Sequence, residues 1–84
     1  MNKYLITIIV PTIELEYDVY IPNNKKIGTI KTLILKSLSE LSNNSFNKKI
    51  DEVRIIDRDT GNEFENNMYV KDSEIKNGSK IIIM

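Results

Sequence analysis

The first 22 residues alternate between apolar and polar positions, which is the period of β-strands. Residues 3–10 are apolar on both faces and rich in β-branched side chains, a composition typical of a central strand. After a break at residues 11–12, residues 13–21 alternate apolar side chains with acidic ones at Glu14, Glu16 and Asp18. The two segments predict a hairpin. Its second strand suits the edge of a sheet, where acidic side chains and a following proline discourage pairing with other chains.

The period changes after residue 26 to that of an amphipathic helix. Lysine, threonine and serine side chains fall on the other faces, while apolar residues recur every three or four positions at Ile27, Ile30, Ile34, Leu38 and Leu41. This spacing predicts a helix of about four turns over residues 27–41 that buries one face, and Lys31 and Lys36 are expected outside that face. The polar residues 42–45 predict its end.

The last part of the chain predicts short strands joined by turns. Residues 52–58 read as a strand that stops at a turn containing Gly61, and residues 63–65 allow a very short strand around Phe64. Val70 and Ile75 are expected to pack inward from a tight turn. Gly78 then reverses the chain into a final apolar strand over residues 80–84.

These elements together predict an α+β fold of the β-grasp type. The first and last strands are the most apolar, so they are expected at the centre of the sheet, with the single helix covering one face. A right-handed crossover through that helix makes the two central strands parallel. The expected architecture is a mixed four- to five-stranded sheet packed on one helix, formed by residues 1–84 as a single domain.

Composition removes several classes of function. Twelve basic and twelve acidic residues are scattered along the chain and balance to zero, so neither a nucleic-acid groove nor a membrane-surface patch is indicated. The chain has no cysteine and no histidine, which removes thiolate chemistry and the commonest general base and metal ligand. No stretch approaches the roughly 20 apolar residues that span a bilayer. We expect a cytoplasmic protein with no catalytic residues, cofactor, metal, nucleic-acid partner or membrane insertion.

The closing segment, residues 64–83, resembles that of ubiquitin-like proteins, where an apolar residue, an aspartate, an isoleucine and a turn precede the last strand. Residues 17–22, Tyr-Asp-Val-Tyr-Ile-Pro, are more specifically similar to the YukD/EsaB group, as are the apolar positions that follow them at Ile27, Ile30, Leu33, Ile34 and Leu38. These are small bacterial ubiquitin-like proteins associated with type VII secretion systems. The similarity covers nearly the whole chain, although the hairpin turn is shorter than expected and Ser79 stands where an aspartate often follows the glycine.

The resemblance implies a non-catalytic protein-interaction module, a cytoplasmic accessory or regulatory component whose partners are secretion-machinery proteins. Ubiquitin and the related sulfur carriers act through a flexible tail ending in Gly-Gly, whereas this chain stops at Met84 inside the predicted last strand. We therefore expect no conjugation. Two alternatives stay open: a sulfur-carrier or tagging protein with a truncated tail, and a cytoplasmic domain excised from a secretion-channel subunit.

Two acidic groups could suggest chemistry. Oxygen-bearing side chains surround one turn, at Asp57, Asp59, Asn62 and Glu63, but their spacing does not match the loop of helix–loop–helix calcium sites. The carboxylates of residues 14, 16 and 18 share a strand face, but no pocket is indicated that would raise the pKa of one of them. Both groups are interpreted as solvated surface.

The second face of the sheet is the best candidate for a functional surface. In the predicted register one set of isoleucines points to the helix: Ile6, Ile8, Ile55, Ile81 and Ile83. The residues left on the open side are Leu5, Ile9, Ile56, Ile82 and Met84. A contiguous apolar patch of this kind often marks a protein interface, so these five are predicted to bind a protein partner. Ile56 and Ile82 are expected to be neighbours, with Leu5 or Met84 at the margin. Leu33 and Leu35, which flank the buried side of the helix, form a second candidate.

Overall fold

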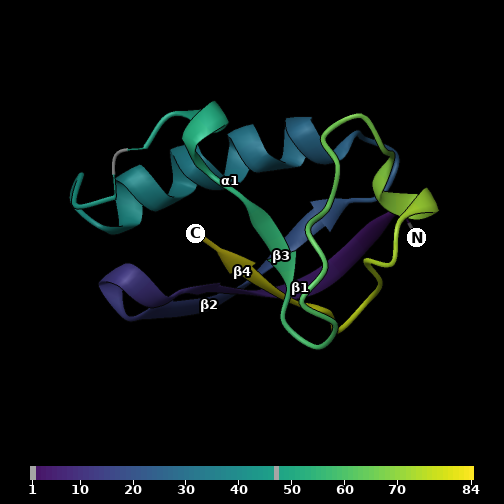
Figure 1. Cartoon of the computed structure of the whole chain (residues 1–84), viewed down its shortest axis with the longest axis horizontal. Coiled ribbons are helices and arrows are strands. Elements are labelled where there is room, and N and C mark those ends of the chain that lie inside the picture. The colour runs from purple at the N-terminus through teal and green to yellow at the C-terminus, as the bar shows by residue number, and fades with distance from the viewer. Residues whose placement is uncertain (1, 47) are drawn as a thin grey trace.

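A computed structural model describes residues 2–46 and 48–84 of the chain. Within them, four strands and one long helix form two layers (Figure 1). The strands are β1 (Lys3–Val10), β2 (Leu15–Pro22), β3 (Ile55–Asp57) and β4 (Lys80–Ile83), and the helix is α1 (Ile27–Leu41). Three short 3₁₀ turns lie between them: η1 (Pro11–Ile13), η2 (Ile50–Glu52) and η3 (Val70–Asp72). The bounds of β1 and α1 agree with those predicted from the sequence.

The sheet has the strand order β2-β1-β4-β3. β1 pairs antiparallel with β2, and β4 pairs antiparallel with β3. The two central strands, β1 and β4, are parallel, which confirms the predicted crossover through α1. The acidic strand β2 lies at one edge, also as predicted.

The core lies between the sheet and α1. The predicted inward residues Ile6, Ile8, Ile55, Ile81 and Ile83 are all buried, and they meet Ile27, Ile30, Ile34 and Leu38 of the helix. Each large aliphatic side chain that is fully buried stabilises the fold by roughly 1.5 to 3 kcal/mol. Val70 and Ile75 are buried from the last turns, as predicted. The remaining core residues are Val10, Ile21, Phe46 and Val53.

The start of α1 is capped by backbone from a distant loop. No side chain caps the helix at Lys26; instead the N–H of Ile27 donates to Met68 O at 2.8 Å and that of Gly28 donates to Asn66 O at 2.9 Å. A Cβ atom at position 28 would lie 3.2 Å from Asn66 O. Glycine therefore allows the loop to approach closely enough to bond the free N–H groups of the first turn.

Two predictions about α1 are wrong. Leu41 is 58 % exposed, because Phe46 enters the core after the last helical turn, with its N–H bonded to Ser42 Oγ at 3.1 Å. Lys31 is buried although it was expected outside the apolar face. The loop that contains residues 63–67 covers it, and the long aliphatic stem of a lysine can be buried beneath such a cover.

Several strands are shorter than predicted. β2 begins at Leu15, since η1 and Glu14, which has a φ of 52°, make a longer connection than the two residues expected. β3 keeps only three residues, and the predicted strand at residues 63–65 is a single bridge between Ile56 and Glu63. β4 ends at Ile83, although Met84 still exchanges two backbone hydrogen bonds with Arg54, at 2.9 and 3.1 Å.

Candidate functional site

Three isoleucines from three strands form a row on the face of the sheet opposite α1. Ile82 of β4 is paired with Ile9 of β1 on one side and with Ile56 of β3 on the other. All three are half-buried, whereas Ile8, Ile55 and Ile81, their neighbours in sequence, are buried beneath the helix. The expectation that Ile56 and Ile82 lie side by side is therefore confirmed.

The other two predicted residues lie at different distances from this row. Met84 follows Ile82 by two positions, is 50 % exposed and extends the apolar surface at one end. Leu5 is separated from Ile9 by Thr7, which occupies the same face of β1, and it pairs with the exposed Tyr20 of β2. The structure thus brings four of the five together and leaves Leu5 apart.

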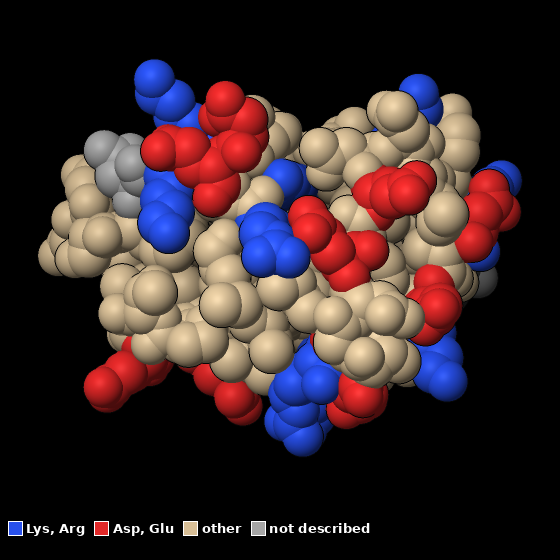
Figure 2. Space-filling model, viewed as in Figure 1, with Lys and Arg blue, Asp and Glu red and all other residues tan. Residues whose placement is uncertain are grey.

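Polar groups of both signs border the row. Thr7 pairs with Lys80 of β4, and its Oγ1 donates to Asp18 Oδ1 at 2.7 Å. Just before β3, Arg54 Nε lies 3.0 Å from Glu63 Oε1. Such exposed pairs contribute at most about 1 kcal/mol each to stability. Figure 2 shows the same mixture of basic and acidic side chains on the side of the molecule that it displays. An apolar centre with a polar margin is the usual anatomy of a protein interface.

The acidic turn after β3 is organised by its own backbone. The side chain of Asp57 is largely buried and accepts a hydrogen bond from Asp59 N–H at 2.8 Å. Gly61, with a φ of 76°, donates its N–H to Asp57 O at 2.8 Å. The Asp57 carboxylate is thus engaged in closing the turn. In residues 2–46 and 48–84, no three acidic side chains are grouped so that they could hold a metal ion.

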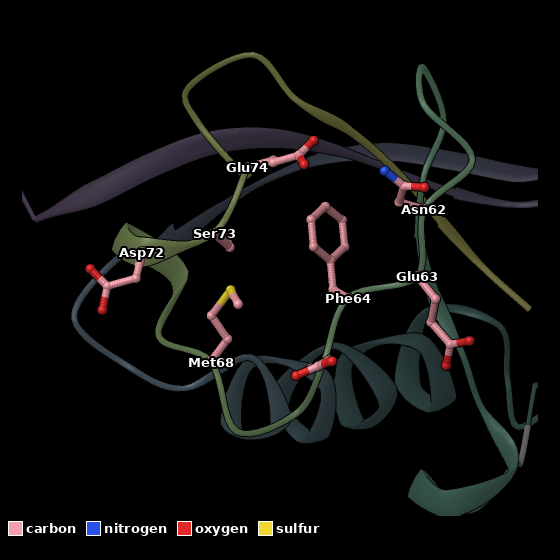
Figure 3. Close-up of a pocket in the computed structure, with 8 residues that line it drawn as sticks. Asn62, Glu63, Phe64, Met68, Asp72, Ser73 and Glu74 are labelled. Atoms are coloured by element: carbon pink, nitrogen blue, oxygen red, sulfur yellow. The ribbon is translucent and has the colours of Figure 1, made fainter.

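A hollow of about 520 Å³ lies between residues 62–68 and 72–74 in the loop region (Figure 3). The ring of Phe64 occupies its middle, and Met68 and Glu74 reach toward that ring. The carboxylates of Glu63 and Asp72 point away on opposite sides. The carboxylates of Glu63, Asp72 and Glu74 therefore do not face one another across the hollow as a pair for acid–base catalysis would.

A smaller apolar groove of about 70 Å³ runs between the edge strand β2 and α1. Val19 and Tyr20 line it from the strand, and Ile30 and Leu33 from the helix. The hydroxyl oxygen of Tyr17 is buried in its wall, with no hydrogen-bond partner among the described residues. Burial raises the pKa of Tyr17 above its ordinary value of 10.0, and the nearby hydroxyl of Ser37 on α1, although it does not reach hydrogen-bond geometry with Tyr17, offsets part of that rise.

Comparison with known proteins identifies the fold. No family model and no curated protein matches the sequence. Among solved structures, the ubiquitin-like domain of an Arabidopsis thaliana protein matches the whole chain over 78 % of its own length, with a TM-score of 0.72 and 15 % identity. Caldiarchaeum subterraneum ubiquitin matches 96 % of the chain over 90 % of its own, with a TM-score of 0.71 and 12 % identity. The chain has the ubiquitin-like fold.

The same fold also occurs in an enzyme assembly. A chain of the toluene 4-monooxygenase HD complex with the inhibitor 4-bromobenzoate matches 96 % of this chain over 95 % of its own, with a TM-score of 0.73 and 12 % identity. At these identities the likeness concerns the β-grasp architecture and not the function. No helix in the described part of the chain is long and apolar enough to cross a membrane.

Leu33 was predicted as part of a second candidate surface, but the groove between β2 and α1 that it lines was not predicted. The groove joins β2 to α1, so it becomes visible only when the strand order places β2 at an edge beside the helix. The one signal in the sequence was Leu33, an apolar residue that flanks the buried side of the helix.

Proposed function

We propose that this ubiquitin-like chain is a non-catalytic protein-interaction module that docks through the open face of its sheet. The row formed by Ile9, Ile82 and Ile56 carries the proposal. These side chains are only half-buried in the isolated chain, and a partner that covers them removes apolar surface from water, worth about 25 cal/mol per Å². The charged margin provides orientation and specificity.

The finer assignment is a cytoplasmic accessory or regulatory component of a bacterial type VII secretion system, acting as one domain over residues 1–84. It is supported by the resemblance of residues 17–22 and of the following apolar helix positions to the YukD/EsaB group. The partners are then components of the secretion machinery. The module needs no cofactor or metal for this role.

The test uses tagged chain expressed in its native host. Ile56→Lys and Ile82→Lys place a charge at the centre of the row, where an unpaired charge buried by a partner is strongly unfavourable. Leu41→Lys changes an equally aliphatic residue that is 58 % exposed at the far end of α1. Each variant is first shown to melt cooperatively. We expect wild type and Leu41→Lys to co-purify type VII components identified by mass spectrometry, and both isoleucine variants to lose them.

Two results would contradict this assignment. If the folded isoleucine variants retain every component, the open face is not the docking surface. If the wild-type chain captures no type VII component, and a deletion strain secretes the substrates of that apparatus normally, the link to secretion is wrong.

A further inference from the structure

Asn77 and Gly78 hold the start of β4 against β1. Where the two strands begin to pair, Thr7 N–H donates to Ser79 O at 2.9 Å, as in an ordinary parallel ladder. Two residues earlier on β1, Leu5 N–H donates to the side-chain oxygen Oδ1 of Asn77 at 2.7 Å, and Gly78 N–H donates to Leu5 O, also at 2.7 Å. The side chain of Asn77 thus takes the place of a backbone carbonyl. These two hydrogen bonds are called the Leu5 clamp.

The turn that carries the clamp is exposed to water. Asn77 and Gly78 are both exposed, and no atom lies within 4 Å of the position that a Cβ of Gly78 would take. Gly78 has a φ of 91°, which glycine adopts without strain. Ser79 closes the turn, because its N–H donates to Lys76 O at 3.0 Å and its Oγ accepts from Lys76 N–H at 2.9 Å. Hydrogen bonds, and not burial, therefore keep the clamp closed.

The order of these two residues allows a reaction with water. Asn77 is the one asparagine of the chain that precedes a glycine. When the backbone nitrogen of the next residue loses its proton and bonds to the side-chain carbon Cγ of an asparagine, the amide group leaves as ammonia and a cyclic succinimide forms. Water then opens the ring at either carbonyl, which gives aspartate or isoaspartate. Glycine favours the first step, because it has no side chain to shield the nitrogen and its backbone turns freely.

The closed clamp holds both reacting groups. The proton that Gly78 must lose is donated to Leu5 O, and the carbonyl group that must be attacked is fixed at its oxygen by Leu5 N–H. The reaction therefore requires the clamp to open first. Exposed turns open locally at a lower free energy than that of global unfolding. The rate of modification at Asn77 then measures how often the start of β4 separates from β1.

We propose that Asn77 is a modification site of this chain, where local opening of the Leu5 clamp lets water convert the asparagine to aspartate and isoaspartate. The aspartate product keeps Oδ1 in place and can close the clamp again. Isoaspartate adds a methylene group to the backbone between residues 77 and 78 and carries its carboxylate directly on Cα, so it cannot restore the bond to Leu5 N–H. The modification thus loosens the start of the central pair of strands permanently. This inference does not depend on the function proposed for the isoleucine row.

The experiment incubates the full chain at mildly alkaline pH, both folded and unfolded in urea, beside a capped peptide of residues 74–80. Cleavage after Glu74 releases residues 75–84, and chromatography with mass spectrometry separates the two products. We expect the folded chain to convert at least about tenfold more slowly than the peptide, an opening free energy of at least about 1.4 kcal/mol. Equal rates would overturn the role of the clamp. Conversion in urea alone would overturn local opening, and faster conversion in urea at Asn44, which precedes Ser45, would overturn the site.

Matched variants separate the clamp from general stability. Ser79→Ala removes the bond to Lys76 N–H and is expected to speed conversion of the folded chain at least about threefold, after correction by a peptide with the same change. Thr60→Ala removes a similar exposed bond, 3.2 Å long, to Asn62 N–H in the turn after β3, and is expected to leave the rate unchanged. Equal effects of the two variants would refute the proposal.

The two products give a second readout. Hydrogen exchange at the Leu5 amide is expected to be as slow in Asn77→Asp as in the wild type, because the acceptor oxygen is kept, and at least about tenfold faster in the purified isoaspartyl form. Equal exchange in the two forms would show that the clamp does not hold this end of the ladder.

Discussion

Ile56 of β3 lies directly opposite Ile82 of β4 on the face of the sheet that α1 leaves uncovered. The adjacent pair, Ile55 and Ile83, points the other way and is buried in the core. A shift of one residue in register would exchange the two pairs. Residues that hold the fold together and residues available to a partner thus alternate along the same strands, so their effects on stability and on binding can be measured separately.

Alanine substitution at two consecutive positions of β4 tests this alternation. Ile81 is 1 % exposed against the helix, whereas Ile82 is half-buried on the open face. We expect Ile81→Ala to lower the free energy of unfolding by about 2 to 5 kcal/mol, because it opens a cavity in the core. Ile82→Ala is expected to cost about 1 kcal/mol. Urea denaturation measures both, and a larger loss for Ile82→Ala would contradict the register.

The contact at the start of α1 reverses the usual effect of replacing a helical glycine. In an ordinary helix position alanine is more stable than glycine by about 1 kcal/mol. At Gly28 the new Cβ would press on Asn66 O, which cannot retreat without weakening its 2.9 Å hydrogen bond to the N–H of residue 28. We expect Gly28→Ala to lower the free energy of unfolding by about 1 kcal/mol. Lys36→Ala, on the exposed side of α1, serves as the control, and a melting temperature raised by Gly28→Ala would show that the loop is free to move.

The unpaired hydroxyl of Tyr17 is expected to reduce stability at neutral pH. A buried polar group without a partner costs roughly 1 to 3 kcal/mol. Tyr17→Phe removes that group and keeps the ring, so it should raise the free energy of unfolding by about 1 kcal/mol. Tyr20→Phe, at a residue 61 % exposed, should change little. If Tyr17→Phe is destabilising instead, the hydroxyl has a partner in solution.

The raised pKa of Tyr17 also predicts a dependence on alkaline pH. The unfolded chain loses the phenolic proton near pH 10.0, whereas burial keeps the folded chain protonated to higher pH. The unfolded state therefore binds fewer protons above that pH, and stability falls as the pH rises toward the folded-state pKa. The contribution is fully present below pH 10. Comparing wild type with Tyr17→Phe at about pH 9 and about pH 11 should show a steeper loss for wild type; parallel curves would contradict it.

Long periodic segments of the sequence predicted the fold well. β1 and α1 have the predicted bounds because each repeats one period over many residues. The region after the helix was less predictable, since β3 has only three residues and the bridge at Glu63 is a single pair. Such short pairings depend on what the tertiary structure brings alongside, and the sequence pattern contains no period for them.

The candidate surfaces also differ in how far the sequence alone predicted them. Strict alternation along β1, β3 and β4 was enough to place the isoleucine row on the open face. The burial of Lys31 could not be predicted, because it depends on a loop more than 30 residues later that covers the helix there. The open edge of β2 and its groove likewise required the strand order.

Photo-crosslinking in the native host tests the docking surface most directly. A photoreactive phenylalanine analogue is placed in turn at position 82, in the centre of the isoleucine row, at position 84 on its margin, and at position 41 on the helix, where the native leucine is 58 % exposed. We predict that irradiation yields discrete protein adducts from positions 82 and 84 and none from position 41. Adducts from position 41 alone, with none from 82 or 84 in folded protein, would contradict the central claim that the open face of the sheet is where partners bind.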